Sequence, residues 1–200
     1  MSTSARIQGL VLAGGTSSRM QRDKAALTYR GRSQLDRVVE LVSRHVRPVF
    51  VSVRADQAAD PTRAQRSLII DSVPGEGPMV GIRSAFARAP DVAWLVVACD
   101  LPFLSDAVVE HLIRARDPNR TATAYRSTHD GLPEPLCAIF EPAAAAGLAA
   151  AQAEGRDCPR KFLINADVSL VEAFDPRALD NVNTPEEYRA ALSALEIPQP

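Results

Sequence analysis

IQGLVLAGGTSSRMQRDK, residues 7–24, is the stretch of sequence that decides the fold. Its first part, residues 7–12, is a short apolar run with β-branched side chains, which predicts a buried strand. Gly14 and Gly15 follow almost directly, and without side chains they let backbone N–H groups come close to phosphate oxygens. A strand that ends on a glycine pair therefore predicts a phosphate-binding turn at the edge of a sheet.

The same turn carries charge and hydroxyl groups suited to a triphosphate. Three hydroxyl side chains follow the glycines, and Arg19 and Lys24 add two cations. The turn is neither a Walker P-loop nor a Rossmann fingerprint, since both GxxxxGK[ST] and GxGxxG are missing. The alternative, a flexible turn with solvated basic residues, leaves this combination unexplained. We therefore predict that residues 12–24 hold a nucleotide triphosphate.

Further strand-like runs alternate with helical patterns over residues 1–116. The expected strands cover residues 7–12, 49–53, 68–70, 93–99, 121–125, 136–140 and 168–173. The expected helices cover residues 33–46, 78–89, 106–116 (capped by Ser105), 143–153, and a segment from Pro185 with Thr184 and Glu187 as a capping box. This alternation predicts a three-layer α/β fold, Rossmann-like, with a mainly parallel (mixed) twisted sheet and helices on both faces.

Polar side chains follow the strand-like runs where ligands of open α/β sheets bind. Ser52 follows Val51 at the end of the second run, Asp71 follows the third, and Asp100 follows the fourth. The carboxyl ends of parallel strands meet at one edge of the sheet, near a switch in strand order. We therefore expect these three side chains and the glycine turn to form one polar site.

Composition limits the class of partner. The net charge is -1 and the cations form no long run, so the sequence carries no footprint for nucleic acid. No stretch approaches the roughly 20 apolar residues that span a bilayer, and the first residues lack the apolar run of a secretory signal. Cys99, Cys137 and Cys158 are odd in number and lie far apart, which favours reduced thiols. We expect a cytoplasmic protein.

Four motifs together resemble one family. They occur in the order LAGGTSSRMQRDK (residues 12–24), IIDSVPGEGPMVGI (69–82), VVACDLPFL (96–104) and DNVNTPEEY (180–188). With them the chain resembles nucleotidyltransferases of the molybdenum cofactor guanylyltransferase type. Related sugar-phosphate and cytidylyl enzymes more often have an alanine in place of the first glycine of the pair. Two positions depart from the family pattern: Gln21 stands where the family usually has glycine, and Ser52 where it often has asparagine.

The resemblance implies an activity and a metal. The chain would transfer GMP from GTP to molybdopterin or molybdenum cofactor and release pyrophosphate. The acceptor phosphate is already an anion, so its attack needs no strong general base, and catalysis would rest on positioning and charge. The aspartate of the family's ACDLPFL motif binds Mg²⁺, which assigns the metal to Asp100, while Arg19 and Lys24 would offset negative charge. The implied catalytic residues are thus Arg19, Lys24 and Asp100.

Other positions fall around this centre. By resemblance Asp71 contacts the nucleotide, and Gly77 in the glycine-rich GEGP stretch suits close approach to a base or ribose. Asn181 and Asn183 would close the back of the site or supply a second metal ligand, and His129 lies in a turn-rich loop on the expected acceptor side. The implied nucleotide-binding residues are Leu12, Ala13, Gly14, Gly15, Lys24, Ser52, Asp71, Gly77 and Asp100.

The chain length suits one α/β domain. We expect a single nucleotidyltransferase domain over residues 1–200, with a nucleotide-binding half (1–116) and an acceptor-binding half (117–200). Two alternatives stay open: cytidylyl or other nucleotidyl transfer to a different phosphorylated acceptor, and a non-catalytic nucleotide-binding regulatory domain. The oligomeric state and proteins that would deliver or receive the cofactor stay open as well.

Overall fold

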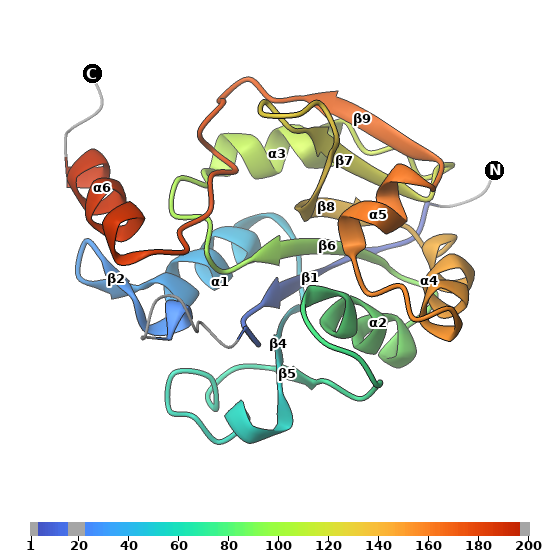
Figure 1. Ribbon diagram of the computed structural model, residues 1–200, viewed down its shortest axis with the longest axis horizontal. Coiled ribbons are helices and arrows are strands. Elements are labelled where there is room, and N and C mark those ends of the chain that lie inside the picture. The colour runs from blue at the N-terminus through green and yellow to red at the C-terminus, as the bar shows by residue number, and fades with distance from the viewer. Residues whose placement is uncertain (1–3, 16–22, 197–200) are drawn as a thin grey trace.

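A seven-stranded twisted sheet forms the centre of the protein. The computed structural model describes residues 4–15 and 23–196 (Figure 1). The strand order is β5-β4-β1-β6-β8-β7-β9. The strands are β1 (Ile7–Leu12), β4 (Val49–Val53), β5 (Leu68–Ile70), β6 (Ala93–Ala98), β7 (Ala122–Arg126), β8 (Pro133–Phe140) and β9 (Val168–Glu172). Within this sheet β8 alone runs against the other strands, which confirms a mainly parallel, mixed sheet.

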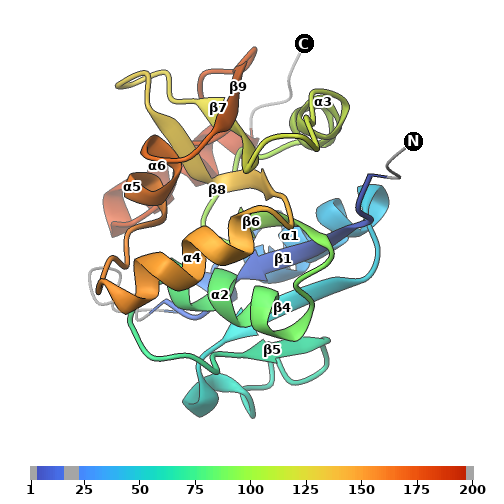
Figure 2. The same cartoon turned by 90° about the vertical axis from the view of Figure 1, so that its right-hand side faces the viewer.

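Helices cover both faces of the sheet and complete the predicted three layers. Figure 2 shows α2 and α4 against one face and α1 and α3 on the other. The helices are α1 (Gln34–His45), α2 (Pro78–Arg88), α3 (Asp106–Arg114), α4 (Ala144–Ala153), α5 (Pro159–Ile164) and α6 (Pro185–Glu196). Each face has its own hydrophobic cluster, one beneath α1 and α3 and one beneath α2, α4 and α5. The site-bearing strands are thus fixed from both sides.

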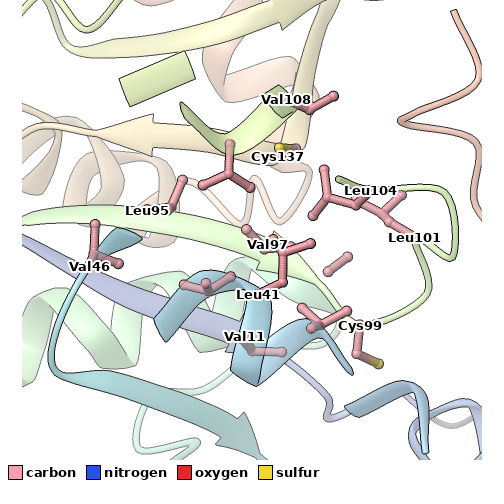
Figure 3. Packing of buried hydrophobic residues seen from close by; sticks show 14 of the residues in the cluster. Val11, Leu41, Val46, Leu95, Val97, Cys99, Leu101, Leu104, Val108 and Cys137 are labelled. Carbon is pink, nitrogen blue, oxygen red and sulfur yellow. The ribbon is translucent and has the colours of Figure 1, made fainter. Parts of the chain in front are cut away.

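The cluster beneath α1 and α3 shows how closely helix and sheet approach. Val11 and Val97 from the sheet pack with Leu41 and Val108 from the helices (Figure 3). Gly9 in β1 lets α1 come this close, because a Cβ there would lie 2.8 Å from Val42. The apolar stripe predicted for this helix is therefore the face that holds β1 in place.

The C-terminal segment returns to the N-terminal half. Helix α6 packs beside a small hairpin of β2 (Thr28–Tyr29) and β3 (Arg32–Ser33), as Figure 1 shows. The Tyr188 and Tyr29 rings meet edge to face at 5.2 Å, and the Tyr188 hydroxyl donates to the Thr28 carbonyl at 2.8 Å. This packing brings the residues just before α6 alongside the carboxyl end of β6, where the Val182 amide donates to the Asp100 carbonyl.

Most predicted elements are present, with some shifted ends. The strands at residues 7–12, 49–53 and 68–70 match the prediction, and those of the second half extend the same sheet as expected. The capping box before α6 is confirmed, because the Glu187 amide donates to the Thr184 hydroxyl and the Thr184 amide donates to the Glu187 carboxylate. Ser105 is the N-cap residue of α3, as predicted, but its side chain makes no capping hydrogen bond. The β2–β3 hairpin and the short 3₁₀ helices at Lys24–Ala26 and Ala55–Gln57 were not anticipated.

Within residues 4–15 and 23–196, no helix combines the length and the hydrophobicity needed to cross a membrane.

Candidate nucleotide-binding site

A cavity of about 730 Å³ opens at the carboxyl ends of β1, β4, β5 and β6. Its volume lies in the usual range for small-molecule sites, ~300–1,000 Å³. All nine residues expected to contact a nucleotide line this cavity: Leu12, Ala13, Gly14, Gly15, Lys24, Ser52, Asp71, Gly77 and Asp100. The nine residues therefore lie together at one edge of the sheet, and their roles stay predictions.

Of the three residues predicted to lie around this centre, the structure places one in the cavity and two at the surface. Asn183 lines the cavity. Asn181 is exposed, and His129 is exposed and pairs with Asp180 at 3.1 Å; neither is among the described residues that line the cavity. Arg19 and Gln21 lie outside the described residues.

Lys24 connects three parts of the chain at the floor of the site. Its Nζ donates to Asp100 Oδ2 at 2.8 Å and to Asn183 Oδ1 at 2.5 Å. Both charged side chains are largely buried, with 18% of Lys24 and 16% of Asp100 exposed. A partly buried ion pair is screened less by solvent than a surface pair, so it holds the turn after β1 against the end of β6.

The other oxygen of Asp100 is the position that suits a metal. Among the residues that the structure describes, Asp100 Oδ1 is buried and has no hydrogen-bond partner. A buried carboxylate oxygen without a partner is costly, and a cation would compensate it. No group of three or more His, Cys, Asp or Glu side chains in the described ranges is arranged to hold a metal. A divalent ion here would take Asp100 as one ligand and complete its shell with phosphate oxygens and water, as such hard cations commonly do.

Asp71 lies opposite, supported by Ser52. The Ser52 hydroxyl, itself buried, donates to Asp71 Oδ1 at 3.3 Å. Burial raises the pKa of Asp71 above its usual value of 3.8, and the Ser52 hydrogen bond and the Arg54 charge only partly counter this. Gly81 in α2 packs directly against Ser52, so that a Cβ there would collide with the Ser52 side chain. Ser52 therefore positions Asp71 as well as lining the cavity.

Glycines shape the rim at the start of α2. Gly77 is the N-cap of that helix with φ 73°, and Gly75 has φ 130°, a region that side chains disfavour. The buried Arg83 of α2 donates to Asp157 Oδ1 at 2.6 Å. Asp157 also lines the cavity, so this pair attaches a loop of the second half to the rim.

Sequence reasoning missed two arginines that contact the glycine turn: Arg63, which is buried behind it, and Arg54, which lines the cavity. Arg63 is 1% exposed and pairs with Asp23, and Arg54 donates to the Gly14 carbonyl at 2.8 Å. Both come from the irregular segment after β4, where arginines normally face solvent. No motif or periodicity in the sequence distinguishes them from the surface arginines.

The remaining candidates are structural. Cys99 and Cys137 are buried, and burial raises the pKa of each thiol to about 12, which makes them inert at neutral pH. His45 pairs with Asp106 on the surface between α1 and α3. His111 contacts the Tyr125 hydroxyl at 3.0 Å.

A glycine turn after β1, with Lys24 and Asp100 paired in a cavity at the carboxyl edge of a mainly parallel sheet, is the arrangement expected of a nucleotide-binding α/β protein. Residues 9–170 match the model of the MobA-like NTP transferase domain, and the chain belongs to this family.

Relatives and solved structures agree with this assignment. A molybdenum cofactor guanylyltransferase of Pseudomonas paraeruginosa is 32% identical, over 88% of this chain and 90% of the relative. A molybdenum cofactor biosynthesis bifunctional protein of Synechocystis is 35% identical over 91% of this chain, which spans 52% of that longer protein. The fold is that of molybdopterin-guanine dinucleotide biosynthesis protein A from Archaeoglobus fulgidus, with a TM-score of 0.79 and 24% identity over 94% of this chain and 97% of that one.

Enzymes of this nucleotidyltransferase type generally use a divalent metal, and the oxygen of Asp100 that has no partner among the described residues fits one.

Proposed function

We propose that the chain transfers GMP from GTP to the phosphate of molybdopterin or molybdenum cofactor and releases pyrophosphate. The observation that carries this proposal is the placement of Asp100 and Lys24 in the cavity that the glycine turn also lines. Both charges are needed for phosphoryl chemistry, because one can hold a cation and the other can offset phosphate charge. The choice of guanine as the base and of the molybdenum cofactor as the acceptor comes from the names of the similar proteins.

The chemistry needs little from the protein beyond positioning. An acceptor phosphate oxygen attacks the α-phosphorus in line, the bond to the β-phosphate oxygen breaks, and pyrophosphate carries away the electron pair. The Gly14 and Gly15 amides hold the β- and γ-phosphates, and Lys24, with Arg19, offsets the charge on the leaving group. Asp100 would hold Mg²⁺, which when bound neutralises phosphate oxygens.

The two halves of the chain divide the substrates in this proposal. Residues 1–116 supply the glycine turn, Ser52, Asp71 and Gly77 for the nucleotide, and residues 117–200 supply the acceptor side of a single domain. Asn183 contacts Lys24 directly and would position it, which makes it a stronger candidate than Asn181 or His129.

Pyrophosphate release with different nucleotides tests the proposal. We expect release with GTP and Mg²⁺ only when the pterin acceptor is present, and much less with CTP, UTP or ATP. Release with CTP in preference to GTP would assign the chain to cytidylyl transfer. Nucleotide binding without release under any combination would make the chain a non-catalytic binding domain.

A thermal-shift panel with the same four nucleotides separates binding from turnover. A nucleotide that binds only the native state increases the free energy of unfolding, by about 2.7 kcal/mol at a concentration of a hundred times its dissociation constant, and so raises the melting temperature. We expect GTP with Mg²⁺ to give the largest shift.

A further inference from the structure

We propose that Arg63 and Arg54 are positioning residues that hold the carbonyls of Ala13 and Gly14 and thereby direct the amides of Gly14 and Gly15 toward the nucleotide phosphates. This inference rests on the proposed function, since it assumes that the glycine turn binds a triphosphate. Neither arginine belongs to the motifs that identify the family.

Arg63 joins the two described sides of the turn. Its Nη2 donates to the Ala13 carbonyl at 3.0 Å and to Asp23 Oδ1 at 2.8 Å, and its Nη1 donates to Asp23 Oδ2 at 2.5 Å. Ala13 precedes the glycines and Asp23 precedes Lys24, so one guanidinium spans the turn from its first residues to its last. This planar, five-donor group suits such bridging, whereas a lysine could not make the paired contacts.

Arg63 is not a phosphate-binding cation itself. It is 1% exposed and is absent from the described residues that line the cavity. Its charge is compensated by Asp23 and by Asp60, whose Oδ1 lies 3.1 Å from Nη1. Burial alone would raise the pKa of Asp23, but the hydrogen bonds from Arg63 and the Ala25 amide and the charges of Arg63 and Arg54 together outweigh burial and hold that pKa below 3.8, so the pair is charged at neutral pH. Its effect on a nucleotide must therefore pass through the Ala13 peptide and Asp23.

Arg54 donates in the same way to the carbonyl of the next peptide. Its Nη1 donates to the Gly14 carbonyl at 2.8 Å, while its Nε and Nη2 donate to the two oxygens of Asp56 at 3.0 and 2.8 Å. The Ala13 amide donates to the Ser52 carbonyl at 3.0 Å, which ties the start of the turn to β4. The carbonyls of Ala13 and Gly14 thus both have guanidinium donors from the segment that follows β4.

Peptide geometry converts these contacts into an orientation of the amides. In a planar trans peptide the N–H points opposite to the carbonyl of the same unit. Fixing the Ala13 carbonyl on Arg63 therefore points the Gly14 amide away from Arg63, and fixing the Gly14 carbonyl on Arg54 points the Gly15 amide away from Arg54. Charge-assisted hydrogen bonds to the carbonyls also polarise the peptides and make the amides better donors. Preorganised donors of this kind bind phosphate without a cost of reorganisation.

Binding of GTP and GMP by an Arg63→Lys variant tests this inference by calorimetry. Lysine keeps the charge but cannot bridge Ala13 and Asp23. We expect GTP binding to weaken about tenfold, roughly 1.4 kcal/mol, because the amides hold the outer phosphates, while GMP binding changes by less than about twofold. Equal losses for both nucleotides, or no loss for GTP, would overturn the inference.

Arg66→Gln is the matched control. Arg66 lies in the same segment and pairs with Asp36 on α1 instead of contacting the glycine turn. Its removal should leave both affinities unchanged, so a GTP-selective loss in this variant would also count against the inference.

Arg54 gives a second test if the buried Arg63 cannot be replaced without unfolding. Arg54 is 36% exposed, so its replacement leaves no cavity in the core. We expect Arg54→Ala to weaken GTP binding selectively, and Arg54→Gln to recover most of the loss through one amide donor to the Gly14 carbonyl. If Arg54→Gln binds GTP as weakly as Arg54→Ala, the charge of Arg54 and not its hold on the Gly14 carbonyl explains the effect, and the inference fails. A wild-type chain that binds no GTP would instead refute the proposed function.

Discussion

Asp100 is held by Lys24 through one oxygen, and its other oxygen has no partner among the described residues. This asymmetry distinguishes it from surface aspartates such as Asp56 and Asp106, in which both oxygens accept hydrogen bonds. A carboxylate held in this way through one oxygen still has a lone-pair site for a cation on the other. We therefore expect the activity to depend more on the charge of the Asp100 side chain than on its shape.

Asp100→Asn tests that expectation. We expect the rate of pyrophosphate release to fall at least about a hundredfold, because an amide neither neutralises Lys24 nor binds a hard cation well. The fold should be retained, as checked by circular dichroism. The control is Asp106→Asn, which removes an exposed aspartate paired with Arg44 and should leave activity unchanged. Near wild-type turnover in Asp100→Asn would exclude the metal assignment.

Asp71 is a residue at which stability and function are expected to conflict. Its pKa in the folded chain is raised above 3.8 chiefly by burial, so the ionised form is disfavoured by folding. A raised acid pKa contributes stability below the unfolded value of 3.8, and that contribution is lost as the pH rises through the folded value. At neutral pH the nucleotide-free protein therefore carries an unfavourable charge at this position.

Asp71→Asn should therefore be more stable than wild type at pH 7 without nucleotide, and should bind GTP more weakly. The stability difference should narrow as the pH falls through the raised folded pKa and then below 3.8, where wild-type Asp71 is neutral in both states. Melting temperatures at several pH values measure this. A stability difference between Asp71→Asn and wild type that grows on acidification would contradict the predicted direction of the pH dependence.

At the scale of secondary-structure elements, α2 and β4 meet where Gly81 packs against Ser52 and Leu12. A Cβ at Gly81 would lie 2.8 Å from a Leu12 methyl group and would overlap the Ser52 side chain. The hydrogen bond from Ser52 to Asp71 depends on this close approach. The packing of a helix on the sheet thus sets the position of a carboxylate in the site.

Overpacking in Gly81→Ala should cost about 1–3 kcal/mol, and up to ~1 kcal/mol of gained helix propensity offsets part of that cost, so stability should fall by up to about 3 kcal/mol. It should also weaken GTP binding, since Ser52 has to move. Urea unfolding and GTP titration measure the two effects. Unchanged stability with unchanged affinity would show that α2 can shift without disturbing Asp71.

At the scale of the whole molecule, sequence pattern was sufficient for the parallel half of the sheet and for the residues at its carboxyl edge. Gly14, Asp71 and Asp100 each follow a run of apolar residues, and parallel strands bring such positions to the same edge. Arg54 and Arg63 carry no such signal, because their places depend on the path of an irregular segment across the sheet edge. His129 was grouped with the acceptor side on local turn composition alone; the structure pairs it with Asp180 at the surface, and its role stays a prediction.

The return of the C-terminal segment has a consequence for biosynthesis. Ribosomes make the chain from residue 1 onward, and all seven strands are complete once β9 has emerged at residue 172. Asn183, which contacts Lys24, and Val182, which contacts the Asp100 backbone, emerge later. A nascent chain can therefore assemble its whole sheet before the last contacts to Lys24 and Asp100 exist, and the site is completed only after residue 183 has emerged.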